Sequence, residues 1–223
     1  MNKVLIVAAH PDDEILGCGG LLSNLRGQAE FKVVFVAEGT TCRYDKPSCE
    51  EAQKEIELRN GFAVKALNFL GVTNYCFYNL PCGRLDNTPQ IEINKIIEKE
   101  IKLFSPDTVF THSNCDSNKD HHKVYDATII ATRPQSLVKR VLSYEVLSST
   151  EWGFDKVFSP NVFYPLTEKN VQDKWGALEF YETEIKEFPY PRSEKGIKTL
   201  ASYRGLQSGY ENAEAYKLIR GEL

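Results

Sequence analysis

Short apolar runs alternate with amphipathic segments along the first two thirds of the chain. Residues 3–9 and 31–39 are dense in valine, isoleucine, leucine or phenylalanine, as strands buried on both faces are. Segments such as 90–104 instead carry apolar residues at the three- and four-residue spacing of one helix face. Because strands that alternate with helices are typical of βαβ units, the pattern predicts an α/β fold with a mainly parallel sheet.

The same reasoning predicts the order of the elements. Strands are expected at 3–9, 31–39, 75–78, 107–112 and 139–147, and helices at 13–27, 49–72, 90–104 and 121–132. After residue 150 the pattern weakens, and it indicates an edge strand at 159–166 and helices at 168–182 and 193–206. The sequence contains no repeat or low-complexity linker. We therefore expect residues 1–223 to form a single domain, a Rossmann-like three-layer sandwich around the sheet.

Composition narrows the classes of function. The formal net charge is -4 and no dense block of lysine and arginine is present, so a nucleic-acid partner is not expected. The apolar run at 4–9 is shorter than a signal-peptide core, and no run is long enough for an integral membrane segment. The six cysteines form no C-x-x-C pair, which favours reduced thiols in a cytoplasmic protein. Small-molecule chemistry is the expected function, and a homo-oligomer is left open.

The residues His-Pro-Asp-Asp-Glu directly follow the first predicted strand. His10 therefore stands at the carboxyl end of a strand, where open α/β sheets place their ligand sites. Pro11 suits the first position of a helix, and in such a helix His10 and Asp13 converge on one point whereas Asp12 points elsewhere. Acidic residues are also common in the first turn of an ordinary helix. This motif alone does not decide between a metal site and a structural role.

A second group of histidines and aspartates follows another predicted strand. It consists of His112, Asp116, Asp120, His121 and His122. Because parallel strands bring their carboxyl ends to one edge of a sheet, we expect the two groups to meet there. Two histidine nitrogens and one carboxylate oxygen suit a catalytic Zn²⁺, one per chain, although other divalent ions can use the same ligands. Cys115 is the alternative fourth ligand of a closed, structural site.

These motifs resemble those of the PIG-L/LmbE-like family of zinc-dependent N-acetylglucosamine N-deacetylases. The likeness rests on AHPDDE at 9–14, THSNCDSNKDHHKV at 111–124 and ATRP at 131–134, together with LPCGRLD at 80–86 and the later PNVF and AEAY. The resemblance implies a hydrolase in which His10, Asp13 and His121 bind zinc. It implies that Asp12 is the general base and that the substrate is an N-acetylated sugar, as a small molecule or a glycoconjugate.

Two positions in the second motif stay open. Many relatives have H-P-D-H where this chain has Asn118 to His121, so the donor that stabilises the oxyanion is expected to be His112 or Asn118. His122 competes with His121 as metal ligand, but it lies about 100° further round the same helix.

Three further residues are considered for supporting roles. Asp120 is expected to orient His121 or another ligand through a hydrogen bond. Arg84 either contacts an anionic part of the substrate or forms a surface salt bridge. Relatives often carry a glutamate where Phe62 stands, three residues after Arg59, so the resemblance assigns no substrate role to Arg59.

Other functions are weighed against the deacetylase. Clusters of histidine and aspartate also build the two-metal sites of phosphoesterases, and the same fold can serve a non-catalytic carbohydrate-binding protein. A dinucleotide-binding oxidoreductase does not fit, because Gly17, Gly19 and Gly20 fall inside the predicted helix instead of at the turn that precedes it.

Overall fold

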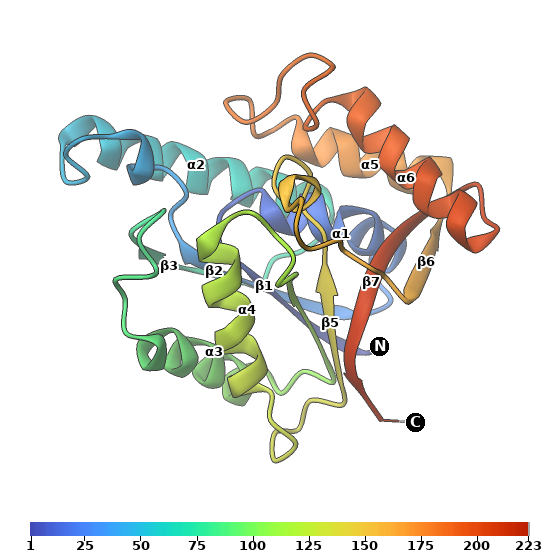
Figure 1. Ribbon diagram of the computed structural model, residues 1–223, viewed down its shortest axis with the longest axis horizontal. Coiled ribbons are helices and arrows are strands. Elements are labelled where there is room, and N and C mark those ends of the chain that lie inside the picture. Colours follow the sequence, from blue (N-terminus) through green and yellow to red (C-terminus); the bar gives the residue numbers. More distant parts are fainter. Residues whose placement is uncertain (223) are drawn as a thin grey trace.

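A seven-stranded sheet runs through the middle of the computed structural model, which describes residues 1–222 (Figure 1). The strands are β1 (Lys3–Ala8), β2 (Glu30–Ala37), β3 (Tyr75–Leu80), β4 (Thr108–His112), β5 (Arg140–Tyr144), β6 (Val162–Leu166) and β7 (Asn212–Gly221). Their order across the sheet is β3-β2-β1-β4-β5-β7-β6. The first five strands pair in parallel, whereas β7 runs antiparallel to both β5 and β6. The prediction of a mainly parallel sheet is confirmed.

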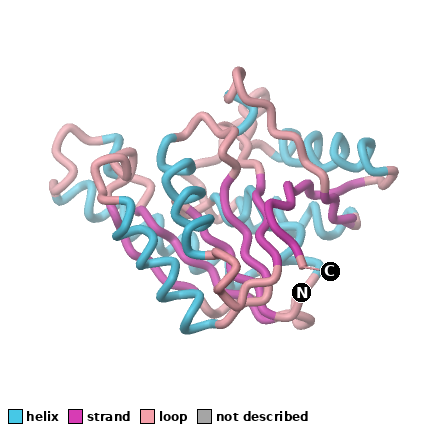
Figure 2. Tube along the Cα trace, turned by 60° about the horizontal axis from the view of Figure 1, so that its bottom comes forward, coloured by secondary structure: helices cyan, strands magenta, loops and turns pink. Residues whose placement is uncertain are grey.

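Helices cover both faces of the sheet (Figure 2). They are α1 (Asp13–Asn24), α2 (Glu50–Phe69), α3 (Gln90–Phe104), α4 (Lys119–Ala131), α5 (Glu168–Leu178) and α6 (Glu194–Ser208). Alternate residues of β1 face opposite layers: Val4 packs in the core with α1, α2, α5 and α6, and Leu5 in the core with α3 and α4. Burial on both faces explains why β1 is a continuous apolar run. The three-layer α/β sandwich predicted from the sequence is therefore present.

The predicted elements match the structure except at the C-terminal end of the chain. Helix α3 has the predicted bounds, and the strand predicted at 159–166 is indeed an edge strand, β6. Strand β7 was not predicted. Its first five residues are all buried, including the polar Asn212 and Glu214, so polarity in the sequence does not follow burial there.

A buried ion pair joins β7 to α1 through α5. The Nζ of Lys174 lies 2.7 Å from a carboxylate oxygen of Glu214 and donates to the carbonyl of Leu16, also at 2.7 Å. Glu214 in turn accepts from the N–H groups of Gly20 and Leu21, at 2.8 and 2.7 Å. The two side chains thus bind the backbone of α1 at one carbonyl and at the two N–H groups that lie four and five residues further along. Burial of this charge pair is tolerated because its polar atoms are hydrogen-bonded.

The glycines of α1 allow its close packing. A Cβ at Gly17 would overlap the ring of Tyr144 on β5, which is fully buried and donates its hydroxyl to the carbonyl of Val7 at 2.9 Å. The glycine-rich sequence therefore serves helix–sheet packing. Within residues 1–222, no helix combines the length and the apolar character needed to cross a membrane.

We predict that Gly17→Ala lowers the free energy of unfolding by about 1–3 kcal/mol, because the new methyl group forces the Tyr144 ring or α1 to move. Gly61→Ala is the matched control, since it also adds a methyl group to a helix and its Cβ would meet nothing within 4 Å. The control is expected to gain about 0.5–1 kcal/mol from helix propensity. Urea unfolding measures both, and equal effects of the two substitutions would contradict this account.

Candidate metal centre

The two groups of histidines and aspartates meet at the carboxyl edge of the sheet, at β1 and β4. The strand order runs outward from this pair in both directions, so the site lies at the topological switch point where α/β sheets bind ligands. His10 follows β1, and His121 lies in the first turn of α4. One nitrogen or oxygen from each of His10, Asp13 and His121 lies within 4.8 Å of the others, and all three residues are buried. The structure therefore brings the three predicted ligands together.

The chain turns sharply between His10 and Asp13. Helix α1 begins at Asp13, and Asp12 before it has φ 115°, in the left-handed region. The N–H of His10 donates to Oδ2 of Asp13 at 2.8 Å, which closes the turn. Pro11 lies in this turn and so does not occupy the first helical position that it suits, whereas the helix begins at residue 13, as the predicted range 13–27 has it. His10 and Asp13 approach each other through the turn and not through helix periodicity.

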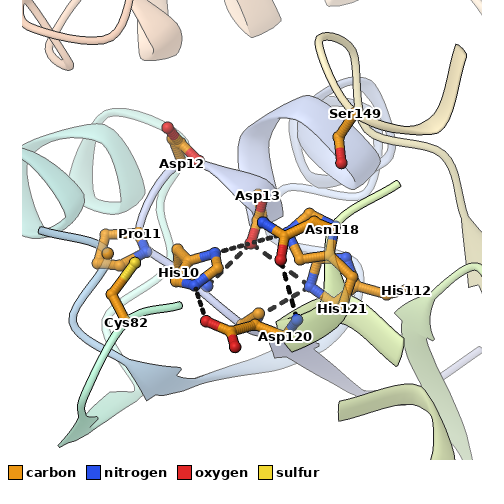
Figure 3. A network of polar contacts seen from close by, with 12 residues as sticks. His10, Pro11, Asp12, Asp13, Cys82, His112, Asn118, Asp120, His121 and Ser149 are labelled. Carbon is orange, nitrogen blue, oxygen red and sulfur yellow. Dashed lines mark hydrogen bonds and ion pairs between the residues drawn. The ribbon is translucent and has the colours of Figure 1, made fainter. Parts of the chain in front are cut away.

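A single carboxylate oxygen of Asp13 faces three imidazole rings (Figure 3). Its Oδ2 lies 3.5 Å from Nδ1 of His10, 3.4 Å from Nε2 of His121 and 3.4 Å from Nε2 of His112. Among residues 1–222, both buried ring nitrogens of His121 lack a hydrogen-bond partner, and Nε2 is the one that faces Asp13. A buried polar atom without a partner calls for an explanation. Two ring nitrogens and a carboxylate oxygen form a donor set that fits zinc or a similar divalent ion.

Asp120 holds His10 from the other side of the ring. Its Oδ2 lies 2.9 Å from Nε2 of His10, so Nδ1 is left to face Asp13. Asp120 itself accepts from the N–H groups of Gly83 and Leu85, at 2.6 and 3.1 Å, in the loop that follows β3. The loop backbone therefore fixes the carboxylate that orients His10, an arrangement common behind metal-bound histidines.

Asp116 has the corresponding position behind His121. Its Oδ2 lies 3.0 Å from Nδ1 of His121, and it also accepts hydrogen bonds from the hydroxyl groups of Ser149 and Thr150. Asp116 was not assigned a role from the sequence. The sequence shows Asp116 in the same motif as His121. It does not show the partners Ser149 and Thr150, which hold the carboxylate in place and come from a loop more than 30 residues away.

The charges around Asp13 make this position favourable for a cation. Burial raises the pKa of Asp13, but the nearby imidazoles of His121 and His112 outweigh it and hold the pKa well below its usual value. Burial lowers the pKa of His121, but the charges of Asp13 and Asp116 raise it to about 10. Both shifts have one cause: the carboxylates stabilise positive charge at the centre of the cluster.

The remaining predicted residues of the second motif differ in accessibility. His112 is fully buried, stacks on His121 at 3.9 Å between ring centroids, and accepts the N–H of Ala9 on its Nε2 at 2.8 Å. Asn118 is half-buried, caps α4 by accepting the N–H of Asp120 at 2.9 Å, and lies beside the ligands in Figure 3. Of these two candidates, Asn118 is the more accessible.

Two further candidates for metal ligands, His122 and Cys115, and one candidate for a substrate contact, Arg84, were also named from the sequence. Nε2 of His122 lies 2.5 Å from the backbone carbonyl of Asp116, and the thiol of Cys115 is 3.5 Å from Asn114. Neither of the metal-ligand groups found within residues 1–222 includes His122 or Cys115. Arg84 is exposed, in the same loop whose N–H groups bind Asp120.

Two arginines bind Asp12. Nη2 of Arg59 and Nη1 of Arg192 lie 2.9 and 2.5 Å from the same oxygen, Oδ2. Arg59 also donates to the carbonyls of Pro11 and Gly39. Burial raises the pKa of Asp12 to about 6, against the lowering effect of the two guanidinium groups. Sequence reasoning considered Arg59 only as a substrate contact and did not consider Arg192, although a charged residue three positions after Ile56 on the apolar face of α2 was a signal that Arg59 is buried.

The third acid of the motif, Glu14, is neutralised differently. It is fully buried, and it accepts the hydroxyl of Tyr181 at 2.5 Å and the N–H of Asp12 at 2.9 Å. Burial raises the pKa of Glu14 to about 8 although these hydrogen bonds oppose the shift. Adjacent acids are thus tolerated because imidazoles surround Asp13, arginines pair with Asp12, and Glu14 keeps its proton at neutral pH.

Comparison with known proteins identifies related sequences. The model of the family described as "PIG-L: GlcNAc-PI de-N-acetylase" matches residues 5–132, which include both motifs. The chain is 28% identical over 188 residues to the uncharacterized deacetylase YaiS of Escherichia coli (strain K12), covering 81% of this chain and 90% of that protein. It is 24% identical over 232 residues to the diacetylchitobiose deacetylase of Thermococcus kodakarensis, covering 99% and 84%.

Solved structures share the fold. The N,N'-diacetylchitobiose deacetylase of Pyrococcus horikoshii superposes with a TM-score of 0.79 at 20% identity, over 99% of this chain and 84% of that one. GalB, the 4-carboxy-2-hydroxymuconate hydratase of Pseudomonas putida KT2440, superposes with a TM-score of 0.75 at 20% identity, over 100% and 98%. At this identity the likeness concerns the fold, which supports more than one chemistry.

We predict that Glu14→Gln changes the pH dependence of stability. The raised pKa means that folded Glu14 keeps its proton between pH 4.5 and about 8, whereas unfolded Glu14 loses it. Native stability therefore falls as pH rises through this window, by up to about 1.4 kcal/mol per pH unit. Glutamine cannot ionise, so the difference in unfolding free energy between the wild type and the variant should show this slope. Urea titrations in chelator at several pH values measure it, and a constant difference would contradict a protonated Glu14.

Proposed function

This chain belongs to the PIG-L family of de-N-acetylases, and we propose that it hydrolyses the N-acetyl group of an N-acetylglucosamine-type sugar or glycoconjugate. The observation that carries the proposal is the convergence of His10, Asp13 and His121 at the switch point of the sheet. The relative from Thermococcus kodakarensis, which is named for diacetylchitobiose, supports an N-acetylated sugar as substrate. We further propose that residues 1–223 act as one catalytic domain.

We assign one divalent ion, zinc by its preference for this donor set, to His10, Asp13 and His121. The ring nitrogens available to it are Nδ1 of His10 and Nε2 of His121, because Asp120 and Asp116 contact the opposite nitrogens. When bound, such an ion supplies Lewis acidity toward a water molecule and the amide carbonyl.

We assign the general base to Asp12. Within residues 1–222, Arg59 and Arg192 both bind Oδ2, so Oδ1 is the oxygen that accepts the proton of the attacking water. The same oxygen then returns the proton to the leaving amine. A pKa of about 6 supports this role, because a base works best when its pKa lies near the working pH.

We assign the oxyanion donor to Asn118. Its Oδ1 is engaged as the cap of α4, and its Nδ2 is the group that donates to the carbonyl oxygen as negative charge develops. His112 is the weaker candidate because it is buried behind His121 and its Nε2 already accepts the N–H of Ala9. We keep Arg84 as the residue that contacts an anionic part of a glycoconjugate, since it is exposed in the loop that binds Asp120.

A hydratase is the second candidate, because GalB has the same fold. The two functions differ in their product: a deacetylase releases a primary amine and acetate, and a hydratase releases neither. A phosphoesterase with a two-metal centre would instead bind two ions per chain.

We predict that the zinc-loaded protein releases a primary amine from N-acetylglucosamine or diacetylchitobiose. Chelation should abolish turnover and zinc should restore it. Asp12→Asn should lower kcat by roughly 10²- to 10⁴-fold, the usual contribution of a general base. Amine detection by fluorescence and metal analysis of the purified protein measure these outcomes.

The matched control is Asp126→Asn, the same change at an exposed position of α4, which should leave kcat unaltered. Amine release that survives Asp12→Asn would refute the assigned base. Zinc binding without amine release from any N-acetylated sugar would refute the deacetylase.

We predict that Asn118→Asp lowers kcat by about 10²- to 10³-fold, because aspartate still caps α4 but has no N–H to donate. Asn118→Ala should lose kcat to a similar extent and, lacking the cap, about 1 kcal/mol of stability as well. Steady-state kinetics and urea unfolding separate the two effects. Full activity in both variants would show that another group stabilises the oxyanion.

A further inference from the structure

Two cysteine thiols from different loops lie in contact beside the metal centre. The Sγ atoms of Cys82 and Cys42 are 3.2 Å apart, although the residues are 40 positions apart in the chain, and both thiols are free. Cys42 follows β2 and Cys82 follows β3. Gly83 has φ +67°, and a Cβ there would come within 3.0 Å of the Cβ of Cys42. A glycine at this position is what allows the two loops to approach.

The two thiols differ in exposure and reactivity. Cys42 is exposed, so a dissolved reagent can reach it, whereas Cys82 is buried. The hydrogen bond from Cys82 lowers the pKa of Cys42 to about 6 despite partial burial, which favours the nucleophilic thiolate at neutral pH. A disulfide bond is about 2.05 Å long, so the sulfur atoms need to approach by only about 1 Å.

We propose that Cys42 and Cys82 form a reversible thiol–disulfide couple that a low-molecular-weight disulfide, such as glutathione disulfide, oxidises. The Cys42 thiolate attacks one sulfur of the oxidant, whose S–S bond breaks and releases one glutathione thiolate. Cys82 gives its proton to solvent and attacks the sulfur of Cys42, which releases the second glutathione. Two protein thiols are oxidised by two electrons while one glutathione disulfide is reduced to two glutathione molecules.

The couple is connected to the metal ligands through Asp120. Cys82 is followed by Gly83 and Leu85, whose N–H groups hold the carboxylate that orients His10. The Sγ of Cys82, an oxygen of Asp120 and a nitrogen of His10 also lie within 4.8 Å of one another. Closing the disulfide draws Cys82 toward Cys42 and thus moves the backbone that positions Asp120. Oxidation therefore weakens the hold on the metal, a consequence that rests on the proposed role of His10.

Mass spectrometry after incubation with excess glutathione disulfide tests the couple without any activity assay. The expected product is a peptide pair linked through Cys42 and Cys82, with the other cysteines unlinked and full reversal by dithiothreitol. Cys82→Ser should trap glutathione on Cys42, Cys42→Ser should leave Cys82 reduced, and the control Cys49→Ser should form the same link as the wild type. Wild-type protein that stays reduced, or that ends with glutathione on Cys42, would overturn the proposal.

Zinc release to a chromogenic chelator tests the connection to the metal centre. We expect the oxidised protein to release zinc about 10- to 100-fold faster than the reduced protein, the range typical for disturbing groups behind a ligand. Cys42→Ser, which forms neither the disulfide nor a glutathione adduct at this pair, should release zinc at one rate in both conditions. Equal rates in oxidised and reduced wild type would overturn the coupling, whereas a protein that takes up no zinc but forms the disulfide would contradict only the proposed function.

Discussion

The carboxylate of Asp13 is the contact on which the site depends. One of its oxygens faces His10, His112 and His121 and also accepts the backbone N–H that closes the turn after β1. These partners come from the end of β1 and, about 100 residues later, from the end of β4 and the start of α4, and they meet because β1 and β4 are neighbours in the sheet. A buried carboxylate needs positive charge or hydrogen bonds around it. The position of Asp13 therefore determines where a cation is stable and which ring nitrogens face it.

The first part of the chain contributes the ligand atoms of this site, and the later part contributes partners of its acidic residues. The ligand atoms come from the segment that the family model matches, residues 5–132. The later part supplies Tyr181, which contacts Glu14, and Arg192, which pairs with Asp12. Both contacts lower the pKa of their acid, against the effect of burial, which raises it. The three adjacent acids of the motif therefore have different pKa values, because different groups of the fold surround each of them.

Local patterns predicted the elements with strong periodicity and the residues that directly follow strands. Helix α3, the parallel strands and the approach of His10 to His121 belong to this class. Strand β7 and the arginines beside Asp12 do not. Glu214 is polar yet buried, and Arg192 lies in an irregular segment 180 positions from its partner, so neither has a local signature. Such residues gain their roles only from contacts that folding creates. The start of α1 at residue 13 was predicted, but the turn that joins His10 to Asp13 before the helix was not, since the bond that closes it has no local signature.

The ion pair between Lys174 and Glu214 also acts as a check on strand alignment. Successive side chains of a strand point to opposite faces, so a slip of β7 by one residue would carry Glu214 to the other side of the sheet. Lys174 would then remain buried beside α1 without its partner, and an uncompensated buried charge costs about 3–5 kcal/mol. Because that penalty falls on misaligned pairings alone, this pair makes the correct antiparallel insertion between β5 and β6 the favoured arrangement.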